Sequence, residues 1–274
     1  DDDAVPDLNG KKAAQIQSEA TALKTRLDNL GLTAEFVAPR LWEDPRTIDG
    51  AFTANDKACR GYANDRAKKC IDIANHLGTD LIVLWLAREG TYIREAKNAR
   101  EAMNRLLESV NMMLDYSKNT RIAIEPKPNE PMDLAYLPTI GHALAIAHQT
   151  VDPGRVGGLI ETAHALLAGL DPSDEMAFAL SQNKLWSVHL NDQNGLKYDQ
   201  DKSFGAANLR AAYNQVRILE LAGYPDTGGY VGLDVKALMK DRKGMKKLLW
   251  KWLPWHSNLA QVVSTGWRDL HMPV

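Results

Sequence analysis

The sequence predicts an α/β fold built from repeated β/α units, and it favours a (β/α)8 TIM barrel among such folds. Short apolar runs typical of strands alternate with longer segments whose apolar residues recur with a period near 3.6. Acidic, imidazole and lysine side chains stand at the ends of several of these apolar runs. In a barrel the carboxyl ends of all strands meet at one mouth, so such side chains would converge there.

Six strands are expected from the apolar runs. Their ranges are 33–38, 80–85, 121–125, 155–161, 185–190 and 230–234. Strands separated by helices of this length pair in parallel through right-handed crossovers. A closed barrel of this kind has eight strands, so about six β/α units are visible and six strands would leave two exposed edges.

Helices are expected between these strands. Their ranges are 11–30, about 20 residues from near Asn55, 96–116, 139–149, 173–182 and 206–222. In the first, residues such as Ile16 and Ala20 form one apolar stripe, and Gly31 is suited to end the helix. Asn55 is a plausible cap for the second helix, and the last helix stops at Gly223.

Length and composition indicate one large α/β domain that acts on small molecules. The chain has 274 residues, 45% of them apolar, which is enough for a substantial core. A net charge of −2 leaves no electrostatic footprint for nucleic acid or an anionic membrane. Cys59 and Cys70 are eleven residues apart in one helical pattern, too far apart to pair. No apolar stretch reaches the length of a membrane span and the polar start is not a signal peptide, so we expect a cytoplasmic protein.

The polar residues at the strand ends predict a metal site. They are Glu125 and Lys127 in IAIEPKPNEP, Glu161 and His164 in GLIETAH, His189 in WSVHLND, Asp199 and Asp201 in KYDQD, and Asp234 and Lys236 in VGLDVK. Carboxylate oxygens with a few imidazoles suit Mg²⁺, Mn²⁺ or Co²⁺, and converging carboxylates repel one another unless a cation lies between them. No GxGxxG or GxxxxGK turn is present, which argues against a doubly wound nucleotide-binding sheet.

Each of these residues also has a purely structural explanation. Asp199 and Asp201 lie in a polar loop, where solvation is the default. His189 could be a core histidine that bonds to the backbone, and Lys236 alone could neutralise Asp234. Lys127 could merely pair with a carboxylate. The metal interpretation is preferred because the donors occur together.

Several stretches of the chain resemble the xylose isomerase family and its TIM-barrel relatives. They are EPKPNEP, ETAHALLAGLDP, HLNDQNGLKYDQDKSFGAANLRAA, the FTAND turn and LDVK, within a likeness that runs from Asp1 to about Lys236. The resemblance implies two divalent cations. The first would chelate substrate oxygens and be held by Glu125, Glu161 and Asp234. Glu161 would bridge to a second, catalytic cation held also by His164, Asp199 and Asp201.

The chain departs from the family pattern in two places. The family has an aspartate where this sequence has His189, and imidazole makes the site less suited to Mg²⁺ and better suited to Mn²⁺ or Co²⁺. Related barrel epimerases use a histidine on that strand. In the family, DDD follows a strand ending in a histidine implicated in opening the sugar ring. That histidine, its strand and the strand before it are absent from this sequence, and Asp3 corresponds to the partner of that histidine.

The resemblance implies a divalent-metal-dependent aldose–ketose isomerase acting on a free sugar, by a hydride shift on the ring-opened form. Lys127 lies two residues beyond Glu125 on an extended strand, so both point to one side and Lys127 can donate to a developing oxyanion. Lys127 is therefore one catalytic candidate, and the resemblance implies Asp3 as the other. Trp42, Trp85 and Lys236 are the candidates for sugar binding, the tryptophans as flat walls that exclude water.

Two other functions stay open, a sugar epimerase of the same superfamily and a metal-binding barrel with impaired turnover. A metal-dependent DNA-repair nuclease is disfavoured by the charge. We expect a metal-dependent barrel domain over 1–236 and a C-terminal helical segment over 237–274 that packs on it. The expected partner is a small sugar, with neither nucleic acid nor membrane, and a homo-oligomer is left open.

Overall fold

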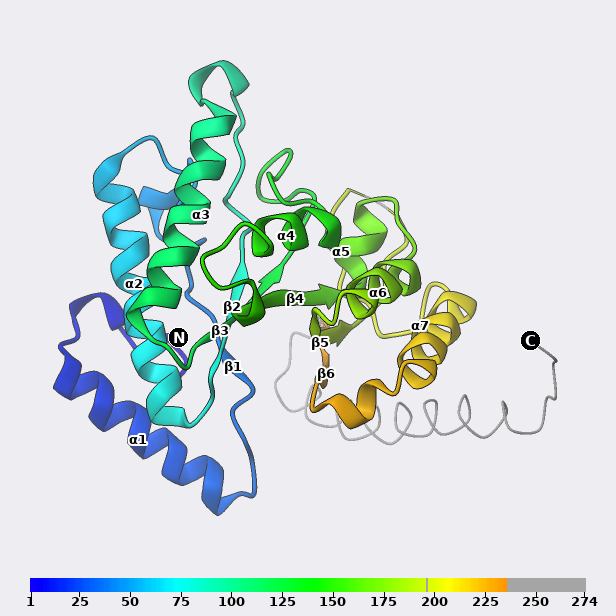
Figure 1. The fold of residues 1–274 in the computed structure, drawn as a ribbon, viewed down its shortest axis with the longest axis horizontal. Helices are drawn as coiled ribbons and strands as arrows, with labels where there is room; N and C mark the ends of the chain where they lie inside the picture. Colours follow the sequence, from blue (N-terminus) through cyan, green and yellow to red (C-terminus); the bar gives the residue numbers. More distant parts are fainter. Residues whose placement is uncertain (196, 236–274) are drawn as a thin grey trace, which may run out of the picture.

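The structure is a computed structural model that describes residues 1–195 and 197–235. The segment 237–274, expected to form the last barrel helix, lies outside the described residues, as does Lys236. Within the described part, strands and helices alternate along the chain, as the sequence predicts (Figure 1).

A single parallel sheet forms the centre of the fold. Its strands lie side by side in chain order: β1 (Phe36–Val37), β2 (Leu81–Trp85), β3 (Arg121–Glu125), β4 (Val156–Glu161), β5 (Leu185–Leu190) and β6 (Tyr230–Leu233). Every neighbouring pair is parallel. Parallel strands in chain order, each joined by a helical crossover, are the arrangement of a β/α barrel. The predicted fold class is confirmed.

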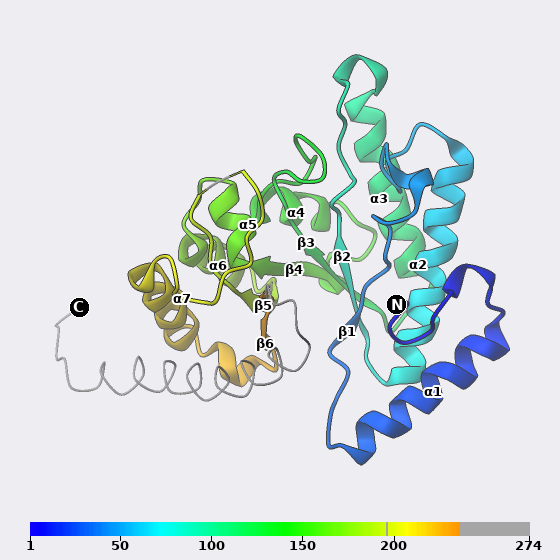
Figure 2. The same cartoon turned by 180° about the vertical axis from the view of Figure 1, so that it is seen from behind.

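The sheet curls into an open half-barrel (Figure 2). Side chains of β1 reach across its concave side to β5, where the rings of Phe36 and His189 have centroids 5.8 Å apart. One residue before β1, Glu35 accepts a hydrogen bond of 2.6 Å from Ser187 Oγ. Among the described residues no strand pairs with the outer edge of β1 or β6, so two sheet edges are exposed.

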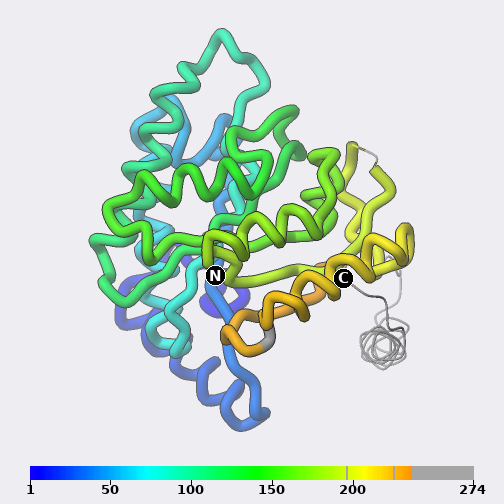
Figure 3. The backbone as a smooth tube through the Cα atoms, turned by 45° about the vertical axis from the view of Figure 1, so that its right-hand side comes forward, coloured from blue at the N-terminus to red at the C-terminus, as the bar shows by residue number. Residues whose placement is uncertain are grey.

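Seven α-helices occupy the connections of the described chain. They are α1 (Ala13–Asn29), α2 (Lys57–Leu77), α3 (Ala99–Tyr116), α4 (Ile140–Ala147), α5 (Thr162–Leu167), α6 (Pro172–Ser181) and α7 (Leu209–Leu221). Short 3₁₀ turns are η1 (Leu8–Gly10), η2 (Pro45–Thr47), η3 (Arg94–Ala96), η4 (Pro153–Arg155) and η5 (Tyr224–Thr227). The tube trace in Figure 3 shows how these connections follow one another around the sheet.

The expected helix ends hold in most places. Gly31 and Gly223 have φ of 66° and 63°, in the left-handed region that glycine adopts without strain. The expected cap at Asn55 is wrong by one residue, because Asp56 accepts from the backbone of the first turn of α2 while Asn55 donates to Ala96 O. Helix α5 was not expected as a separate element.

The main core lies between the sheet and its helices, and a smaller cluster fills the concave side. That inner cluster contains Leu81, Val83, Ala123 and Leu159. Gly158 in β4 brings α4 close to the sheet, since a Cβ there would lie 2.3 Å from Ile140 Cδ1. Both cysteines of the described chain are buried and free. No helix of the described part is long and apolar enough to cross a membrane.

Candidate metal centre

A cavity of about 450 Å³ opens at the carboxyl ends of the strands. Its lining includes the seven residues that the sequence predicts as metal ligands, namely Glu125, Glu161, His164, His189, Asp199, Asp201 and Asp234. Lys127, Trp42 and Trp85 line the same cavity. Residues spread over more than a hundred positions of the sequence thus meet at one mouth, as the barrel topology requires.

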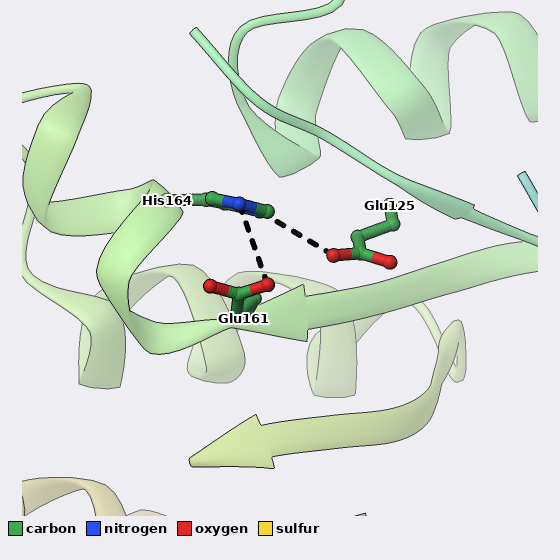
Figure 4. Close-up of side chains that lie close together, drawn as sticks. All are labelled: Glu125, Glu161 and His164. Atoms are coloured by element: carbon green, nitrogen blue, oxygen red, sulfur yellow. Dashed lines mark ion pairs between the residues drawn. The ribbon is translucent and has the colours of Figure 1, made fainter. Parts of the chain in front are cut away.

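Glu125, Glu161 and His164 form the most buried part of the site (Figure 4). Glu125 and Glu161 are the last residues of β3 and β4, and His164 stands on α5, immediately after β4. His164 Nδ1 lies 3.5 Å from Glu125 Oε1, and His164 Nε2 lies 3.3 Å from Glu161 Oε2. The short helix α5 therefore turns the imidazole back over the two strand ends.

Asp199 and Asp201 reach the cavity from the long connection between β5 and α7. An antiparallel bridge between Asp192 and Lys202 closes this loop at its base. Glu130, in the loop after β3, accepts a hydrogen bond of 2.9 Å from the backbone N–H of Asp199. The loop is thus held at both its base and its tip, and Asp199 Oδ2 lies 3.2 Å from His164 Nε2.

His189 and Asp234 complete the donor set on the side of β6. His189 is in β5, Asp234 directly follows β6, and His189 Nδ1 lies 3.9 Å from Asp234 Oδ2. Asp234 is the most accessible of the donors, with a side chain 52% exposed. The donor set therefore runs from a buried end at Glu125 to an open end at Asp234.

Glu161 is the centre of the cluster. Three groups have donor atoms that all lie within 4.8 Å of one another: Glu125 with Glu161 and His164, Glu161 with His189 and Asp234, and Glu161 with Asp199 and Asp201. Glu161 belongs to all three. Glu125 is grouped with His164 rather than with Asp234, the partner that the family resemblance gives it.

The electrostatics of the cluster fit a bound dication. Burial raises the pKa of Glu125 to about 8, and burial and the charge of Glu125 raise the pKa of Glu161 well above its usual range. Burial also lowers the pKa of His164 and His189, which favours the neutral imidazole that binds metals. Nδ1 of both histidines is buried without a hydrogen bond to any described residue. A cation among these groups would offset the cost of ionising the carboxylates.

Lys127 and two tryptophans border the donor cluster. Lys127 Nζ lies 2.8 Å from Asp199 Oδ2 and 5.0 Å from the centroid of the Trp85 ring. The rings of Trp42 and Trp85 pack edge to face with centroids 4.5 Å apart. The cavity therefore has a charged side and an aromatic side.

Asp3 does not reach the cavity. Its side chain is 91% exposed and lies 3.2 Å from Arg40 Nη2. Asp1, two residues earlier, is the buried acid of this segment and pairs with Arg66 at 2.8 Å. A catalytic role for Asp3 stays a prediction, because the structure places this side chain outside the cavity.

Three lining or supporting residues were not expected from the sequence. The Phe36 ring lies near the His189 ring, tilted from it by 34°. Glu130 holds the Asp199 loop, and Asn191 contacts Glu161 and Asp201 directly. Of these three, Asn191 alone could have been predicted from the sequence, because it directly follows the strand that contains His189 and strand ends meet at the mouth of a barrel. The contacts of Glu130 depend on a loop about 70 residues away, so no local pattern points to them.

The fold and the site together define the class of this protein, a β/α barrel with a candidate divalent-metal centre at the carboxyl ends of its strands. Comparison with known proteins specifies the family. The profile described as xylose isomerase-like TIM barrel matches residues 3–228, and the chain belongs to this family.

Individual relatives show the same likeness. The chain is 36% identical over 228 residues to a xylose isomerase of Thermus thermophilus, covering 82% of this chain. This chain spans 58% of the length of that relative. Among solved structures, a D-tagatose 3-epimerase-like protein matches with a TM-score of 0.66 at 18% identity, over 88% of this chain and 84% of its own. A 3-keto-D-glucoside 4-epimerase from E. coli matches with a TM-score of 0.65 at 13% identity. That match covers 87% of this chain and 86% of the epimerase chain. These two likenesses are of fold.

Proposed function

We propose that this chain carries the metal centre of a sugar isomerase that interconverts an aldose and a ketose, most simply xylose and xylulose. The observation that supports this most is the sharing of Glu161 among three donor groups at the mouth of the barrel. A shared carboxylate is what two neighbouring cations need, and a second cation needs the further donors that His164, Asp199 and Asp201 offer. The 36% identical xylose isomerase supports the same reaction class.

The proposed holders divide into two overlapping sets. Glu125, Glu161 and Asp234, with His189 beside them, would hold one divalent cation. Glu161, His164, Asp199 and Asp201 would hold the other. The cations supply polarisation of substrate oxygens and a water of lowered pKa when bound. Because the set includes two imidazoles, we propose Mn²⁺ or Co²⁺ ahead of Mg²⁺.

The remaining side chains would act on the ring-opened sugar itself. In the reaction the C2–H bond breaks, its hydrogen moves with the electron pair to C1, and the proton of O2 passes to O1. Lys127, which lies in the cavity lining, would donate to the oxygen on which negative charge develops. Trp42 and Trp85 would lie against the carbon chain and exclude water from the path of the hydride.

The test is a label experiment on protein loaded with Mn²⁺ or Co²⁺. Aldose carrying deuterium at C2 is incubated with the protein, and the ketose is examined for deuterium at C1. Retention of the label supports a hydride shift. The Glu161→Gln variant is the matched control and is expected to show no turnover. Absence of saturable uptake of either cation by the unmodified protein would refute the proposal.

A second candidate function is sugar epimerisation, and His189 is the observation that favours it. Its imidazole lies beside Asp234 and Glu161, where the isomerase pattern has a carboxylate. An epimerase exchanges a proton at one carbon by means of an acid and a base, so deuterium at that carbon would be lost to solvent. Loss of label in the same experiment would therefore replace the isomerase proposal with this one.

Impaired turnover is the third candidate, and the position of Asp3 outside the cavity favours it. A chain that holds the cations but does not open the sugar ring would act on acyclic substrates alone. We propose to compare a cyclic aldose with glyceraldehyde, which cannot form a stable ring. Turnover of glyceraldehyde without turnover of the cyclic sugar would assign the defect to ring opening.

A further inference from the structure

Asn191 contacts two of the candidate metal ligands, Glu161 and Asp201, and is not itself one of the candidate ligands. It directly follows β5 and its side chain is fully buried. Its Nδ2 donates to Glu161 Oε1 at 2.7 Å and to Asp201 Oδ1 at 3.3 Å. The same amide thus touches a carboxylate on β4 and a carboxylate on the loop after β5.

The orientation of this amide is determined by a third hydrogen bond. Asn191 Oδ1 accepts from the backbone N–H of Ala163 at 2.7 Å, in the first turn of α5. An amide oxygen can accept that N–H and an amide nitrogen cannot, so Nδ2 is the group that faces the two carboxylates. Helix α5, the end of β4 and the loop that carries Asp201 are therefore joined through one side chain.

We propose that Asn191 is a positioning residue that fixes Glu161 and Asp201 in the geometry that binds cations, an inference that rests on the proposed metal centre. A neutral amide suits this role, since it donates to carboxylates without reducing their total negative charge. A lysine or arginine in its place would compete with the dication. By bonding Oε1 of Glu161, Asn191 also leaves Oε2 facing His164 Nε2, 3.3 Å away.

Removal of the amide has a defined consequence for cation affinity. Glu161 and Asp201 would lose their shared donor, which would no longer hold the two side chains in their present positions. Groups that orient metal ligands from behind typically change metal affinity about 10- to 100-fold when they are removed. We expect a loss of this size for Mn²⁺ in the Asn191→Ala variant.

The experiment is a calorimetric titration of the full chain with Mn²⁺, together with the visible absorption spectrum of the Co²⁺-loaded protein. Thr162→Val is the matched control. Thr162 is buried next to Glu161, but its hydroxyl donates to Gln215 at 2.8 Å and not to a candidate ligand. Asn191→Ser keeps a smaller hydrogen-bond donor. This variant is used in place of Asn191→Ala if circular dichroism shows that Asn191→Ala is unfolded. It is expected to bind Mn²⁺ with intermediate affinity.

The outcomes separate this inference from the proposed function. Saturable Mn²⁺ binding by the unmodified protein and Thr162→Val, with about 10- to 100-fold weaker binding and shifted Co²⁺ bands for Asn191→Ala, supports the inference. Equal affinities and spectra for the unmodified protein and the Asn191 variants overturn it and leave the metal centre standing. An equal loss in Thr162→Val overturns it too, because any buried hydrogen bond would then have the same effect. No saturable uptake by the unmodified protein overturns both proposals.

Discussion

Replacing Glu125 by glutamine should change the stability of the cation-free protein and of the cation-loaded protein in opposite directions. Glu125 is 5% exposed, and burial raises its pKa to about 8 from an ordinary value of 4.5. Each unit by which folding raises the pKa of a carboxyl group corresponds to about 1.4 kcal/mol for ionising that group in the folded state. At pH 7 the carboxylate therefore destabilises the cation-free fold by about 3 kcal/mol relative to a neutral group of the same shape.

The amide of the Glu125→Gln variant keeps the shape and removes this cost. Its amide oxygen can also accept a hydrogen bond from protonated Glu161, as the Glu125 carboxylate does. Without cations, the variant should thus be the more stable protein at pH 7, with Tm higher by about 6–12 °C. Since the folded pKa is raised, the contribution of Glu125 to the stability of the cation-free fold falls as pH rises from 4.5 to about 8. The gap between variant and unmodified protein should therefore widen over that range and vanish near its lower end.

With cations the order should reverse. Glutamine offers a weaker donor than carboxylate, so Mn²⁺ should stabilise the variant much less than the unmodified protein. The assay is urea unfolding followed by circular dichroism, in EDTA and in saturating Mn²⁺, between about pH 4.5 and 8. A less stable variant in EDTA would refute the electrostatic argument. Equal stabilisation of both proteins by Mn²⁺ would remove Glu125 from the metal ligands.

Three further substitutions test other parts of the site and its support. Lys127→Met should lower kcat about 100- to 1000-fold, as loss of an oxyanion donor does. The exposed Lys118→Met is the control, and a normal kcat for Lys127→Met would exclude Lys127 from catalysis. Trp85→Leu should raise KM about three- to tenfold, in line with about 0.5–1.5 kcal/mol for an aromatic contact, and an unchanged KM would place the ring outside the sugar site. Glu89→Gln should destabilise the fold by about 2–4 kcal/mol in urea unfolding. The reason is that Glu89 accepts from the backbone N–H groups of Ala51, Phe52 and Thr53, in the β1–α2 connection that also carries Trp42. The exposed Glu108→Gln is the control, and equal unfolding midpoints for Glu89→Gln and the unmodified protein would contradict the argument.

Five of the six strands could be predicted to within one residue at each end, and the exception is the edge strand β1. The expected ranges for β3 and β5 coincide with Arg121–Glu125 and Leu185–Leu190, because each is a mostly apolar segment between turn residues. The edge strand β1 was expected over 33–38 and shrinks to Phe36–Val37. It pairs with β2 alone, so its length depends on a partner that the local sequence does not contain.

The site divides in the same way between local and long-range information. Glu125 and Glu161 could be predicted because they are the last residues of apolar strands, and strand ends meet in a barrel. Asp199 and Asp201 sit in a polar loop whose place in the cavity depends on Asp192, Lys202 and Glu130. Such contacts follow no periodicity, so only the likeness to a family could suggest them.

The position of Asp3 follows from local contacts that the likeness to the family does not contain. The buried guanidinium of Arg66 pairs with Asp1 and Asp2, which fixes the start of the chain against α2. With its two neighbours directed inward by that pairing, Asp3 extends into solvent beside Arg40. The candidate metal donors come from β3, β4, β5 and α5, from the residue after β6 and from the loop after β5. The proposed cation binding and the predicted role of Asp3 therefore depend on separate parts of the structure, and loss of one would not imply loss of the other.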